Sequence, residues 1–416
     1  MRIALLSYRS KSHVGGQGVY LRHLTRELVA LGHTVEVLSG QPYPDLDPGV
    51  LLTKVPSLDL YREPDPFRTP RLGEYRDLVD VEEFLTMCTG GFPEPRTFSR
   101  RVLRVLEERA GDFDVVHDNQ TLGGALLDVE ALGVPLVATI HHPITMDRRI
   151  ELAAAPTWRR RWGVWRWYGF VRMQRRVARR IRMILTPSEA SARDAAREFG
   201  LDRRRVRSIL LGVDERFVPP TGPRVPGRIL AMASADAPLK GIATLLEAFA
   251  KLRTERDVHL VLVSSLKPGG VTERLIDQIG IAEHVSFAKG IGDDELVALM
   301  GSAEVACVPS LYEGFSLPTA ELMACATPLV VTRAGAIPEV VGPDGLAADI
   351  VAPGDAAELT TALAALLDDP DRRARLGAAG RRRTQELFSW KAVAAKTVAA
   401  YEEAIAQYQE ETRAHR

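Results

Sequence analysis

The chain contains few cysteines and no long apolar run, and both absences narrow the class of protein. Its 416 residues include three cysteines, Cys88, Cys307 and Cys325, whose spacing is not that of a metal site or a redox pair. No apolar stretch approaches the roughly 20 residues of a membrane-spanning helix, and the first residues indicate a strand, not a signal peptide. We therefore expect a cytoplasmic protein in which Cys307 and Cys325, set in apolar runs, are buried thiols.

The chain also lacks an excess of charge of either sign. Lysine and arginine total 54, and aspartate and glutamate total 54, so no overall charge attracts the protein to nucleic acid. The hydrophobic content of 46% and the charged content of 26% are ordinary for a globular protein. The length suggests two or three domains with full-sized cores.

Strands and helices alternate through the first part of the chain. Residues 3–7 predict a strand, a glycine loop follows, residues 19–31 predict a helix, and residues 34–39 predict the next strand. The same alternation predicts strands at 114–117, 136–140 and 183–186. This pattern indicates a parallel, doubly wound, Rossmann-like domain over residues 1–212. Residues 41–99 contain many prolines and few periodic stretches, and we interpret them as an insertion over the face of this domain.

A second alternating half follows a proline-rich linker at residues 213–227. Its expected strands lie near 228–233, 260–264, 285–287, 305–308 and 329–331. Residues 228–388 are therefore expected to form a second Rossmann-like domain, and residues 389–416 are expected to include a final amphipathic helix. The predicted fold class is α/β, with two doubly wound domains facing a central cleft formed by their switch-point crevices.

The most informative segment carries Glu313 and Glu321, eight residues apart. An apolar strand, a glycine-bearing loop and the start of a helix together present unpaired N–H groups and a helix dipole to an anion. Two carboxylates beside that anion can accept hydrogen bonds from hydroxyl groups, and hydroxyls next to phosphate describe a nucleotide sugar. A glycosidase is disfavoured, since eight helical residues cover about 12 Å whereas a retaining glycosidase pair lies about 5 Å apart. The alternative interpretation is a solvated helix with two surface acids.

The run Tyr-Glu-Gly-Phe-Ser-Leu-Pro, followed by Ala-Cys-Ala-Thr-Pro, resembles the Glu-x7-Glu signature of family 4 retaining glycosyltransferases, which have the GT-B fold. The resemblance implies that Glu313 is catalytic and orients the hydroxyls of the donor sugar, and that Glu321 binds the ribose hydroxyls. It also implies that the final helix crosses back to the first domain. The residues expected to line the donor diphosphate in this segment are Gly314, Phe315, Ser316 and Leu317.

Gly16 and Gly18 follow the first strand and open the first helix, where backbone amides can approach a phosphate. They do not form a dinucleotide fingerprint, because its third glycine would fall at Leu21 and no acid closes the second strand. A dehydrogenase is therefore disfavoured. The resemblance places Gly16 and Gly18 beside the donor diphosphate, and the alternative is a glycine turn for tight packing.

His141 and His142 end an expected strand at the predicted crevice. A lone histidine is usually structural, but two after a buried strand favour contact with substrate. The family has a histidine here that faces the donor sugar, and the resemblance assigns this position to His141, with His142 as a competitor. We expect one imidazole nitrogen to donate to a sugar hydroxyl while the protein fixes the other.

Lys240 precedes Gly241 and an apolar helix at 242–251, and this arrangement resembles the family's Lys-Gly motif, whose lysine binds the donor diphosphate. A lysine at a helix N-terminus opposes the helix dipole unless an anion is present, which favours a binding role. The family usually carries an arginine after the preceding strand, but residues 231–237 contain none. Either another cation such as Lys267 reaches the diphosphate, or the affinity for the donor is low.

Lys289, Gly290 and Ile291 follow another expected strand, and in the family this loop packs against the nucleobase. Its side chains do not distinguish uracil from guanine, so UDP and GDP both stay open. Two Asp-x-Asp tripeptides, 45–47 and 369–371, lie in proline-containing turns, and we interpret them as turn residues and not as a metal site. The resemblance implies metal-independent, front-face substitution with no organic cofactor.

Residues 157–182 are basic and aromatic. Ten arginines lie between Trp158 and Arg182, and no acidic residue occurs from Leu152 to Ser188. The ordinary interpretation is a helix with a solvated basic face. The alternatives are peripheral contact with anionic lipid at the inner face of the membrane, an acceptor site for an anionic group, and single-stranded nucleic acid. The neutral overall charge argues against the last.

These features predict a hexosyltransferase-type, retaining glycosyltransferase that moves a sugar from a nucleoside-diphosphate sugar to a small-molecule or lipid-linked acceptor, with no nucleic acid involved. A GT-B nucleotide-sugar epimerase is one alternative, although it would need further acid/base residues that the sequence does not identify. A catalytically silent, membrane-associated nucleotide-sugar-binding protein is another. The missing arginine supports the latter, and the presence of Glu313, Glu321 and Lys240 opposes it.

Overall fold

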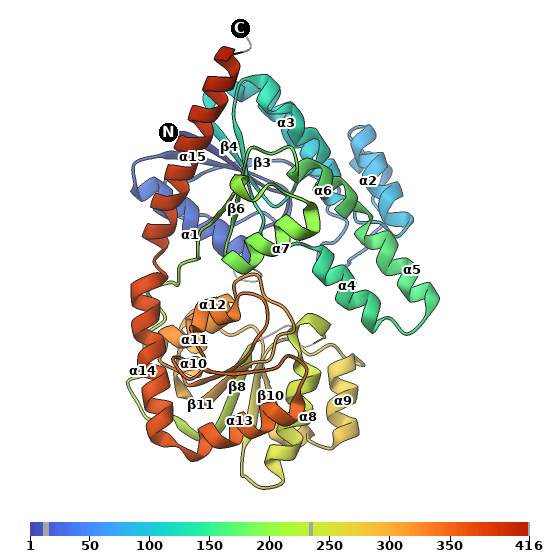
Figure 1. Ribbon diagram of the computed structural model, residues 1–416. Helices are drawn as coiled ribbons and strands as arrows, with labels where there is room; N and C mark the ends of the chain where they lie inside the picture. The colour runs from blue at the N-terminus through green and yellow to red at the C-terminus, as the bar shows by residue number, and fades with distance from the viewer. Residues whose placement is uncertain (11–15, 233–235, 415–416) are drawn as a thin grey trace. The chain divides into compact units, whose positions relative to one another are not determined.

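A computed structural model describes residues 1–10, 16–232 and 236–414, and in it the chain forms two compact units (Figure 1). Unit 1 comprises Met1–Ile209 together with Trp390–Arg416, and unit 2 comprises Leu210–Ser389. Each unit is built on one parallel sheet covered by helices. The described helices include none long and apolar enough to cross a membrane.

Unit 1 contains a seven-stranded sheet of order β3-β2-β1-β4-β5-β6-β7, in which all neighbours run parallel. Its strands are β1 (Arg2–Ser7), β2 (Thr34–Ser39), β3 (Leu51–Lys54), β4 (Val115–Asn119), β5 (Leu136–Thr139), β6 (Met183–Thr186) and β7 (Val206–Ser208). Its α-helices are α1 (Gly16–Ala30), α2 (Leu78–Cys88), α3 (Glu94–Arg109), α4 (Thr145–Ala154), α5 (Trp158–Trp167), α6 (Val171–Ala178), α7 (Glu189–Phe199) and α15 (Trp390–Ala414).

Unit 2 contains a six-stranded sheet of order β10-β9-β8-β11-β12-β13, again parallel throughout. Its strands are β8 (Val225–Met232), β9 (His259–Val263), β10 (Val285–Ala288), β11 (Ala303–Val308), β12 (Leu329–Thr332) and β13 (Asp349–Val351). Its α-helices are α8 (Ile242–Arg253), α9 (Val271–Ile279), α10 (Asp293–Ser302), α11 (Leu317–Ala324), α12 (Ile337–Val341), α13 (Ala356–Asp368) and α14 (Pro370–Leu387).

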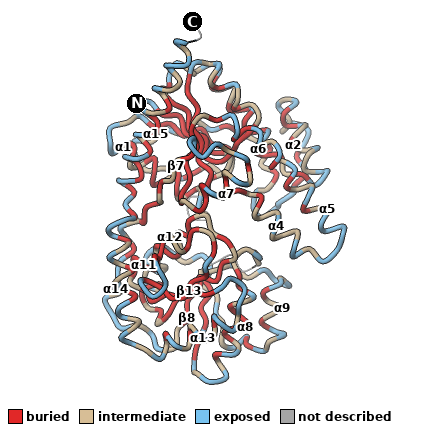
Figure 2. The backbone as a smooth tube through the Cα atoms, in the orientation of Figure 1, coloured by how far each residue is buried: buried red, intermediate tan, exposed pale blue. Residues whose placement is uncertain are grey.

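The core of each unit lies along its sheet, where the strand backbone is buried (Figure 2). Strands covered on both faces read as continuous apolar runs, as in Ile3–Leu6, where every residue is buried. Cys307 and Cys325 are buried free thiols, as expected. The Asp-x-Asp at 369–371 begins a helix, since the Asp369 carboxylate accepts a hydrogen bond from the Arg372 N–H at 2.8 Å.

Both sheets reverse their strand order at one point, between β1 and β4 in unit 1 and between β8 and β11 in unit 2. Ligands of doubly wound sheets bind outside the carboxyl ends of the strands at such a switch point. The loops that follow β1, β4, β8 and β11 are therefore where candidate site residues are expected.

Residues 41–99 are more regular than the sequence indicates. They contribute β3 to the edge of the sheet, helix α2 and the first turns of α3. The sequence did not reveal these elements, because a four-residue edge strand is too short to show periodicity, and the interpretation of the segment as an insertion stays a prediction.

Candidate active site

Lys240 and Glu313 form an ion pair in unit 2. The Lys240 ammonium (Nζ) lies 2.8 Å from Glu313 Oε1, and the Ser310 hydroxyl donates to the same oxygen at 2.7 Å. Lys240 ends a short 3-10 helix after β8, while Ser310 and Glu313 follow β11. The two loops at the switch point thus bring a cation, a carboxylate and a hydroxyl together.

Backbone contacts hold these loops against each other. The Leu311 N–H donates to the Leu239 carbonyl at 2.7 Å. Gly241 has φ +64°, and a Cβ there would lie 2.0 Å from the Pro309 carbonyl oxygen. Gly335, with φ +55°, passes equally close to the Glu313 carbonyl, 2.1 Å from where its Cβ would lie. The glycines let three backbone segments meet, which fixes where Lys240 and Glu313 lie.

The residues between the two glutamates lead into helix α11. Ser316 precedes the helix in a left-handed conformation, with φ +80°, and its hydroxyl lies 2.8 Å from the Thr319 hydroxyl. Phe315 is buried and packs edge-on against Phe388, with ring centroids 5.6 Å apart. Gly314 and Leu317 complete the turn, so Glu313 stands directly before the N-terminus of α11, as the sequence predicts.

Glu321 lies on α11 beside two charged residues that the sequence analysis left in the linker. Burial raises the pKa of Glu321 to about 7, with a further increase from the Asp214 carboxylate and a decrease from the Arg216 guanidinium. Arg216 is within 3.2 Å of Asp214 Oδ1 and also pairs with Asp293 at the start of α10. Glu321 therefore lies near charged residues, Asp214 and Arg216, that are not part of the Glu-x7-Glu segment.

Lys289, Gly290 and Ile291 form the loop between β10 and α10, and Gly290 adopts φ +66°. The loop leads directly to Asp293, which forms an ion pair with Arg216. Arg216 also acts on the pKa of Glu321, so the end of this loop lies near Glu321. Lys267, the other cation considered for the diphosphate, is exposed after β9. The stretch after β8 where the family arginine would lie includes residues 233–235, which are outside the described residues.

His141 in unit 1 is buried and firmly oriented. Its Nε2 lies 2.7 Å from Asn119 Oδ1, its backbone N–H donates to Gln120 Oε1 at 2.6 Å, and its carbonyl accepts from Ser191 at 3.0 Å. The Asn119 amide donates in turn to the Gln17 carbonyl at 3.4 Å, which fixes its oxygen toward the imidazole. Burial lowers the pKa of His141 to about 3, so the ring is neutral near pH 7.

This orientation reverses one expectation. Because Asn119 presents an oxygen, His141 Nε2 carries the proton and donates, and Nδ1 keeps its lone pair. The imidazole can accept a hydrogen bond from a hydroxyl group, whereas the sequence analysis expected it to donate. His142 differs, since its Nε2 lies 2.8 Å from Asp147 Oδ2. Gly18 is buried in the first turn of α1 and Gly16 is exposed at its start.

A buried polar chain adjoins His141. His117 on β4 contacts the Tyr401 hydroxyl through Nδ1 at 2.6 Å and the Thr139 hydroxyl through Nε2 at 2.7 Å. The Tyr20 hydroxyl lies 3.1 Å from Thr139, and the Tyr20 ring packs edge-on to His141 with centroids 4.9 Å apart. Burial lowers the pKa of His117 to about 3. Helix α15, through Tyr401, is thereby part of the surroundings of His141.

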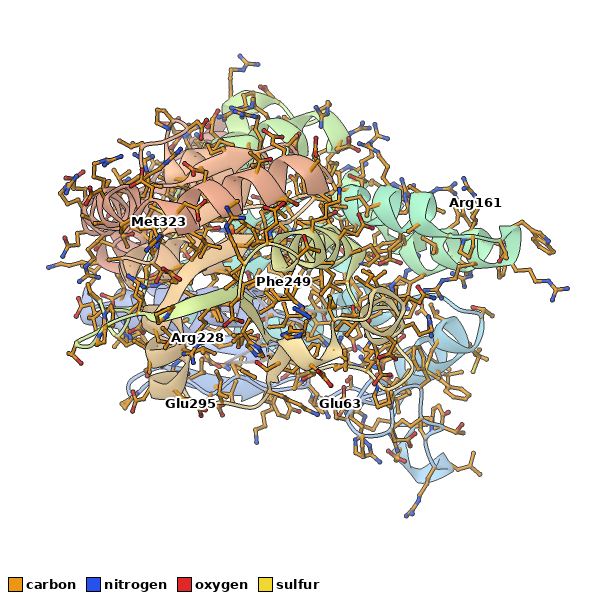
Figure 3. All side chains as sticks on the ribbon, turned by 90° about the horizontal axis from the view of Figure 1, so that it is seen from below. Glu63, Arg161, Arg228, Phe249, Glu295 and Met323 are labelled. Atoms are coloured by element: carbon orange, nitrogen blue, oxygen red, sulfur yellow. The ribbon has the colours of Figure 1, made fainter. Side chains whose placement is uncertain are left out.

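The basic stretch forms helices α5 and α6, joined by one 3-10 turn. Trp158, Trp162 and Trp165, at positions i, i+4 and i+7, are 73%, 59% and 46% exposed and lie on one side of α5. Figure 3 labels Arg161 on this helix, and the Arg161 guanidinium donates to the Leu152 carbonyl at 3.2 Å. Arg166 donates to the Thr89 hydroxyl, just after α2, at 2.6 Å in an exposed contact.

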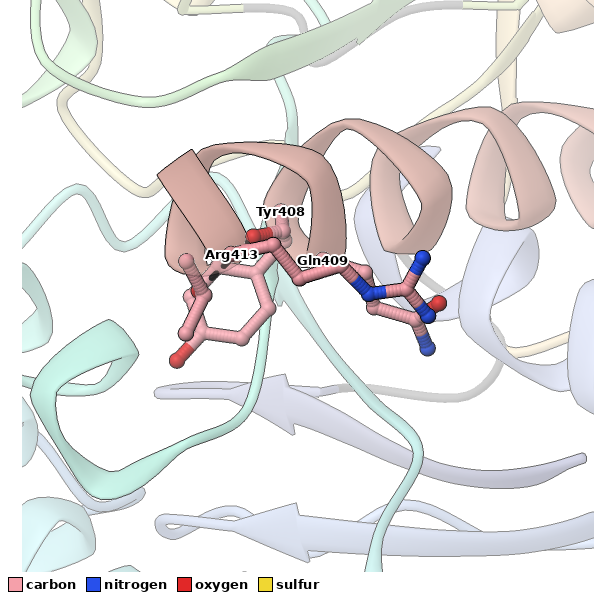
Figure 4. Close-up of a pocket in the computed structure, with 4 residues that line it drawn as sticks. Tyr408, Gln409 and Arg413 are labelled. Carbon is pink, nitrogen blue, oxygen red and sulfur yellow. Dashed lines mark hydrogen bonds between the residues drawn. The ribbon is translucent and has the colours of Figure 1, made fainter. Parts of the chain in front are cut away.

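A shallow hollow on the last turns of α15 is lined by Tyr408, Gln409, Thr412 and Arg413 (Figure 4). The Tyr408 hydroxyl donates to the Glu130 carbonyl, which precedes β5. The hollow is therefore at the amino ends of the strands, opposite the edge where such sheets bind ligands. Among the described residues, no group of three or more histidine, cysteine, aspartate or glutamate side chains could hold a metal ion.

Comparison with known proteins gives two family matches that together span most of the chain. Residues 14–217 match the family described as Glycosyltransferase Family 4, and residues 214–383 match Glycosyl transferases group 1. The MMP alpha-(1->4)-mannosyltransferase of Mycolicibacterium hassiacum is 61% identical over 408 residues, covering 98% of this chain and 99% of that protein. A D-inositol 3-phosphate glycosyltransferase of Xylanimonas cellulosilytica is 31% identical, covering 97% of each chain.

Solved structures show the same fold at low sequence identity. Sucrose-phosphate synthase of Thermosynechococcus elongatus has a TM-score of 0.71 and 21% identity, covering 98% of this chain and 99% of its own. HepE of Anabaena, solved in complex with UDP-glucose, has a TM-score of 0.70 and 16% identity, covering 96% and 100%. With both families matched and a mannosyltransferase so similar over nearly its whole length, the chain belongs to the family 4 glycosyltransferases and is a hexosyl-transferring enzyme of the GT-B fold.

Proposed function

We propose that the enzyme is a retaining mannosyltransferase that uses a nucleoside-diphosphate mannose, UDP- or GDP-linked, and forms an α-(1→4) bond to a saccharide acceptor. The observation that carries the donor part is the 2.8 Å contact between Lys240 and Glu313 at the switch point of unit 2. The mannosyl group and the linkage are taken from the M. hassiacum relative at 61% identity. That similarity also disfavours the epimerase and the silent binding protein.

The ion pair gives the two residues linked roles. A diphosphate beside the N-terminus of α11 would attract Lys240 and draw it away from Glu313, because a doubly charged anion competes with a single carboxylate. Glu313 would then be free to accept hydrogen bonds from the hydroxyls of the transferred sugar. Gly314, Phe315, Ser316 and Leu317 would supply backbone N–H groups to the same phosphates.

Glu321 is proposed to bind the ribose. Ribose hydroxyls donate best to an ionised carboxylate, and Arg216 beside it favours that form. Lys289, Gly290 and Ile291 are proposed to contact the nucleobase through backbone groups. Gly16 and Gly18 are proposed to approach the donor diphosphate from unit 1.

The proposed reaction is a front-face substitution without a metal or an organic cofactor. The bond from the anomeric carbon to the diphosphate oxygen breaks, and a bond from the same carbon to the acceptor oxygen forms on the same face. The proton of the acceptor hydroxyl moves to the leaving phosphate oxygen. Lys240 and the start of α11 stabilise the charge on the leaving group. His141 Nδ1 accepts a hydrogen bond from a hydroxyl of the donor sugar.

The test combines transfer, linkage and metal dependence. GDP-mannose and UDP-mannose are each incubated with 4-α-linked mannobiose in the presence of EDTA, and the products are examined by NMR. The expected product from GDP-mannose is a trisaccharide with a new α-(1→4) bond, absent with Lys240→Ala. A β-linked product would overturn retention, loss of activity in EDTA would overturn metal independence, and no transfer of mannose would overturn the donor assignment.

We also propose peripheral contact of α5 with an anionic membrane surface. Trp158, Trp162 and Trp165 project on one side of the helix, and Arg159 and Arg172 lie over two of these rings, at 5.5 and 5.1 Å. Exposed tryptophans next to cations suit the headgroup region of a bilayer.

A further inference from the structure

An aromatic cluster in unit 1 is built from segments far apart in the sequence. The Tyr61 ring lies 5.4 Å from Phe67, 5.4 Å from Phe92 and 5.8 Å from Trp167, measured between centroids. Phe92 and Trp167 are themselves 5.1 Å apart. Tyr61 and Phe67 come from the loop between β3 and α2, Phe92 precedes α3, and Trp167 ends α5. Three segments of the chain therefore meet in one aromatic surface.

Two charged residues lie against this cluster. Arg9, two residues beyond the end of β1, places its guanidinium 5.6 Å from the Tyr61 ring centroid. Its Nε is 3.5 Å from Oε2 of Glu94, a residue only 8% exposed. Arg9 belongs to the loop at the switch point of unit 1, where a doubly wound sheet binds its ligand. The cluster therefore adjoins the edge of the sheet at which a substrate is expected.

Three buried polar atoms of this group have no hydrogen-bond partner among the described residues. They are Arg9 Nε, Glu94 Oε2 and the Tyr61 hydroxyl. A buried polar group without a partner destabilises a protein, so native structures seldom keep one without a reason. Arg9 Nε and Glu94 Oε2 form an ion pair at 3.5 Å, which is too long for a good hydrogen bond. These two atoms and the Tyr61 hydroxyl can therefore still pair with the hydroxyls of a ligand.

The loop that carries Tyr61 and Phe67 is held in a strained shape. Phe67 has φ +66°, which a bulky side chain rarely adopts, yet its ring is 59% exposed. Its N–H donates to the Leu60 carbonyl at 2.7 Å, closing the loop. Such strain persists where the surroundings enforce it and is concentrated at binding sites.

Buried ion pairs hold the loop that carries Tyr61 and Phe67 in this strained shape. Arg101 on α3 pairs with Asp80 at 2.6 Å and with Glu83, both on α2. Glu83 in turn accepts from the Leu58 N–H at 3.4 Å, and Arg68 donates to the Leu58 carbonyl at 2.7 Å. The loop is tied to two helices before any ligand arrives, which lowers the entropic cost of binding.

We propose that Arg9, Tyr61, Phe67, Phe92, Glu94 and Trp167 form the acceptor subsite of the enzyme and bind an uncharged saccharide. A sugar ring presents C–H groups to aromatic faces, and its hydroxyls both donate and accept. They can therefore pair with Glu94, Tyr61 and Arg9 at once. The proposal rests on the glycosyl transfer proposed above, and it assigns residues to the acceptor, which the donor-site residues do not identify.

The charge of the subsite favours a neutral ligand over a phosphorylated one. Glu94 lies beside Arg9 and offsets its positive charge, so no surplus cation is left for a phosphate. Burial raises the pKa of Glu94, and the Arg9 guanidinium acts in the opposite direction by favouring the ionised carboxylate that offsets its charge. The ionised carboxylate accepts hydrogen bonds from the hydroxyls of a sugar.

The test measures acceptor binding separately from donor binding. The variants are Phe67→Ala, whose exposed ring can be removed without opening the core, and Glu94→Gln, which keeps the shape of the side chain. Leu72→Ala is the matched control, since Leu72 is 93% exposed in the same segment. The readouts are KM for 4-α-linked mannobiose, saturation-transfer NMR of the same sugar, and calorimetric affinity for GDP and UDP.

We expect each variant to raise the acceptor KM about tenfold or more and to weaken the NMR contact, with nucleotide affinity unchanged and Leu72→Ala like the wild type. Normal KM and normal saturation transfer in both variants would overturn the subsite while leaving glycosyl transfer intact. If mannobiose shows a saturation-transfer signal with the wild type and none with the variants, the subsite is supported. This holds even if the enzyme transfers no mannose to it. Displacement of mannobiose by D-inositol 3-phosphate, with no effect from neutral polyols, would overturn the preference for an uncharged ligand.

Discussion

The two units hold their candidate site residues in different ways. In unit 2, Lys240 and Glu313 come from two short segments that follow adjacent strands, and each segment is recognisable on its own. In unit 1, the proposed subsite gathers single residues from positions 9, 61, 67, 92, 94 and 167. The proposed donor site depends on local backbone geometry, and the proposed acceptor subsite depends on tertiary packing.

The difference is consistent with what each unit is proposed to bind. Phosphate is recognised by backbone N–H groups and a helix terminus, which need a fixed local sequence. A saccharide is recognised by side chains on a surface, which several elements can supply.

The sharpest test of the donor half is Glu313→Gln. We expect turnover to fall about 100-fold, because the residue acts on charge that develops in the transition state. Affinity for the nucleoside diphosphate should be kept or should rise, since Lys240 loses its competing partner. Glu247→Gln, an exposed change on α8, serves as the control. A loss of nucleotide affinity equal to the loss of rate would contradict the assigned role.

Glu321→Ala should act on binding instead. Removal of a carboxylate that accepts from ribose hydroxyls costs about 1.5–3 kcal/mol, so affinity for GDP or UDP should fall about tenfold or more. Calorimetry measures this directly, with Glu247→Ala as control. If affinity stays the same, Glu321 has no part in the ribose site.

His117→Gln examines the packing of unit 1 through pH. Burial lowers the pKa of His117 to about 3, so between roughly pH 3 and 6.5 the unfolded chain binds a proton that the folded chain does not. Stability from this residue is therefore complete above pH 6.5 and falls as the pH drops, by about 2 kcal/mol at pH 5.

The variant should show a shallower loss of stability between pH 7 and pH 5 in denaturant titrations. His141, Asp118 and Glu94 also have shifted pKa values, but they are present in both proteins and cancel in the difference. Equal slopes for the two proteins would show that His117 is not a buried neutral group.

The smallest expected effect concerns α5. Wild-type protein should sediment with anionic vesicles at low salt and dissociate as salt rises, because each basic residue near the surface contributes about 1 kcal/mol and is screened within a Debye length. Replacement of Arg159, Arg160, Arg161 and Arg172 by glutamine should abolish sedimentation and leave nucleotide affinity unchanged. Failure of the wild type to sediment would identify a solvated helix face.

The sequence predicted the parts of the molecule that depend on local order. Strands such as Thr34–Ser39 and Met183–Thr186 were located to the residue, since buried parallel strands are continuous apolar runs. The switch-point rule places the loops that carry Lys240 and Glu313 at the same edge of the sheet. It does not predict that the two side chains contact each other directly. Edge strands β3, β7 and β13 were missed, because runs of three or four residues carry too little pattern.

Residues whose role depends on a neighbour in space escaped prediction. Asn119 sets the proton position of His141, but it is adjacent only through the pairing of β4 with β5. Arg216 looked like part of a linker, and its link to Asp293 appears only when residues 77 apart meet. The aromatic cluster likewise has no signature in any single segment.

Helix α15 has a consequence for how the chain matures on the ribosome. Unit 1 holds the first 209 residues, yet Tyr401, fully buried against His117, is made almost last. Unit 2 is continuous from Leu210 to Ser389 and can complete its fold as soon as it emerges. The part of the protein that is synthesised first is therefore finished last, because its closing helix is the final element to leave the ribosome.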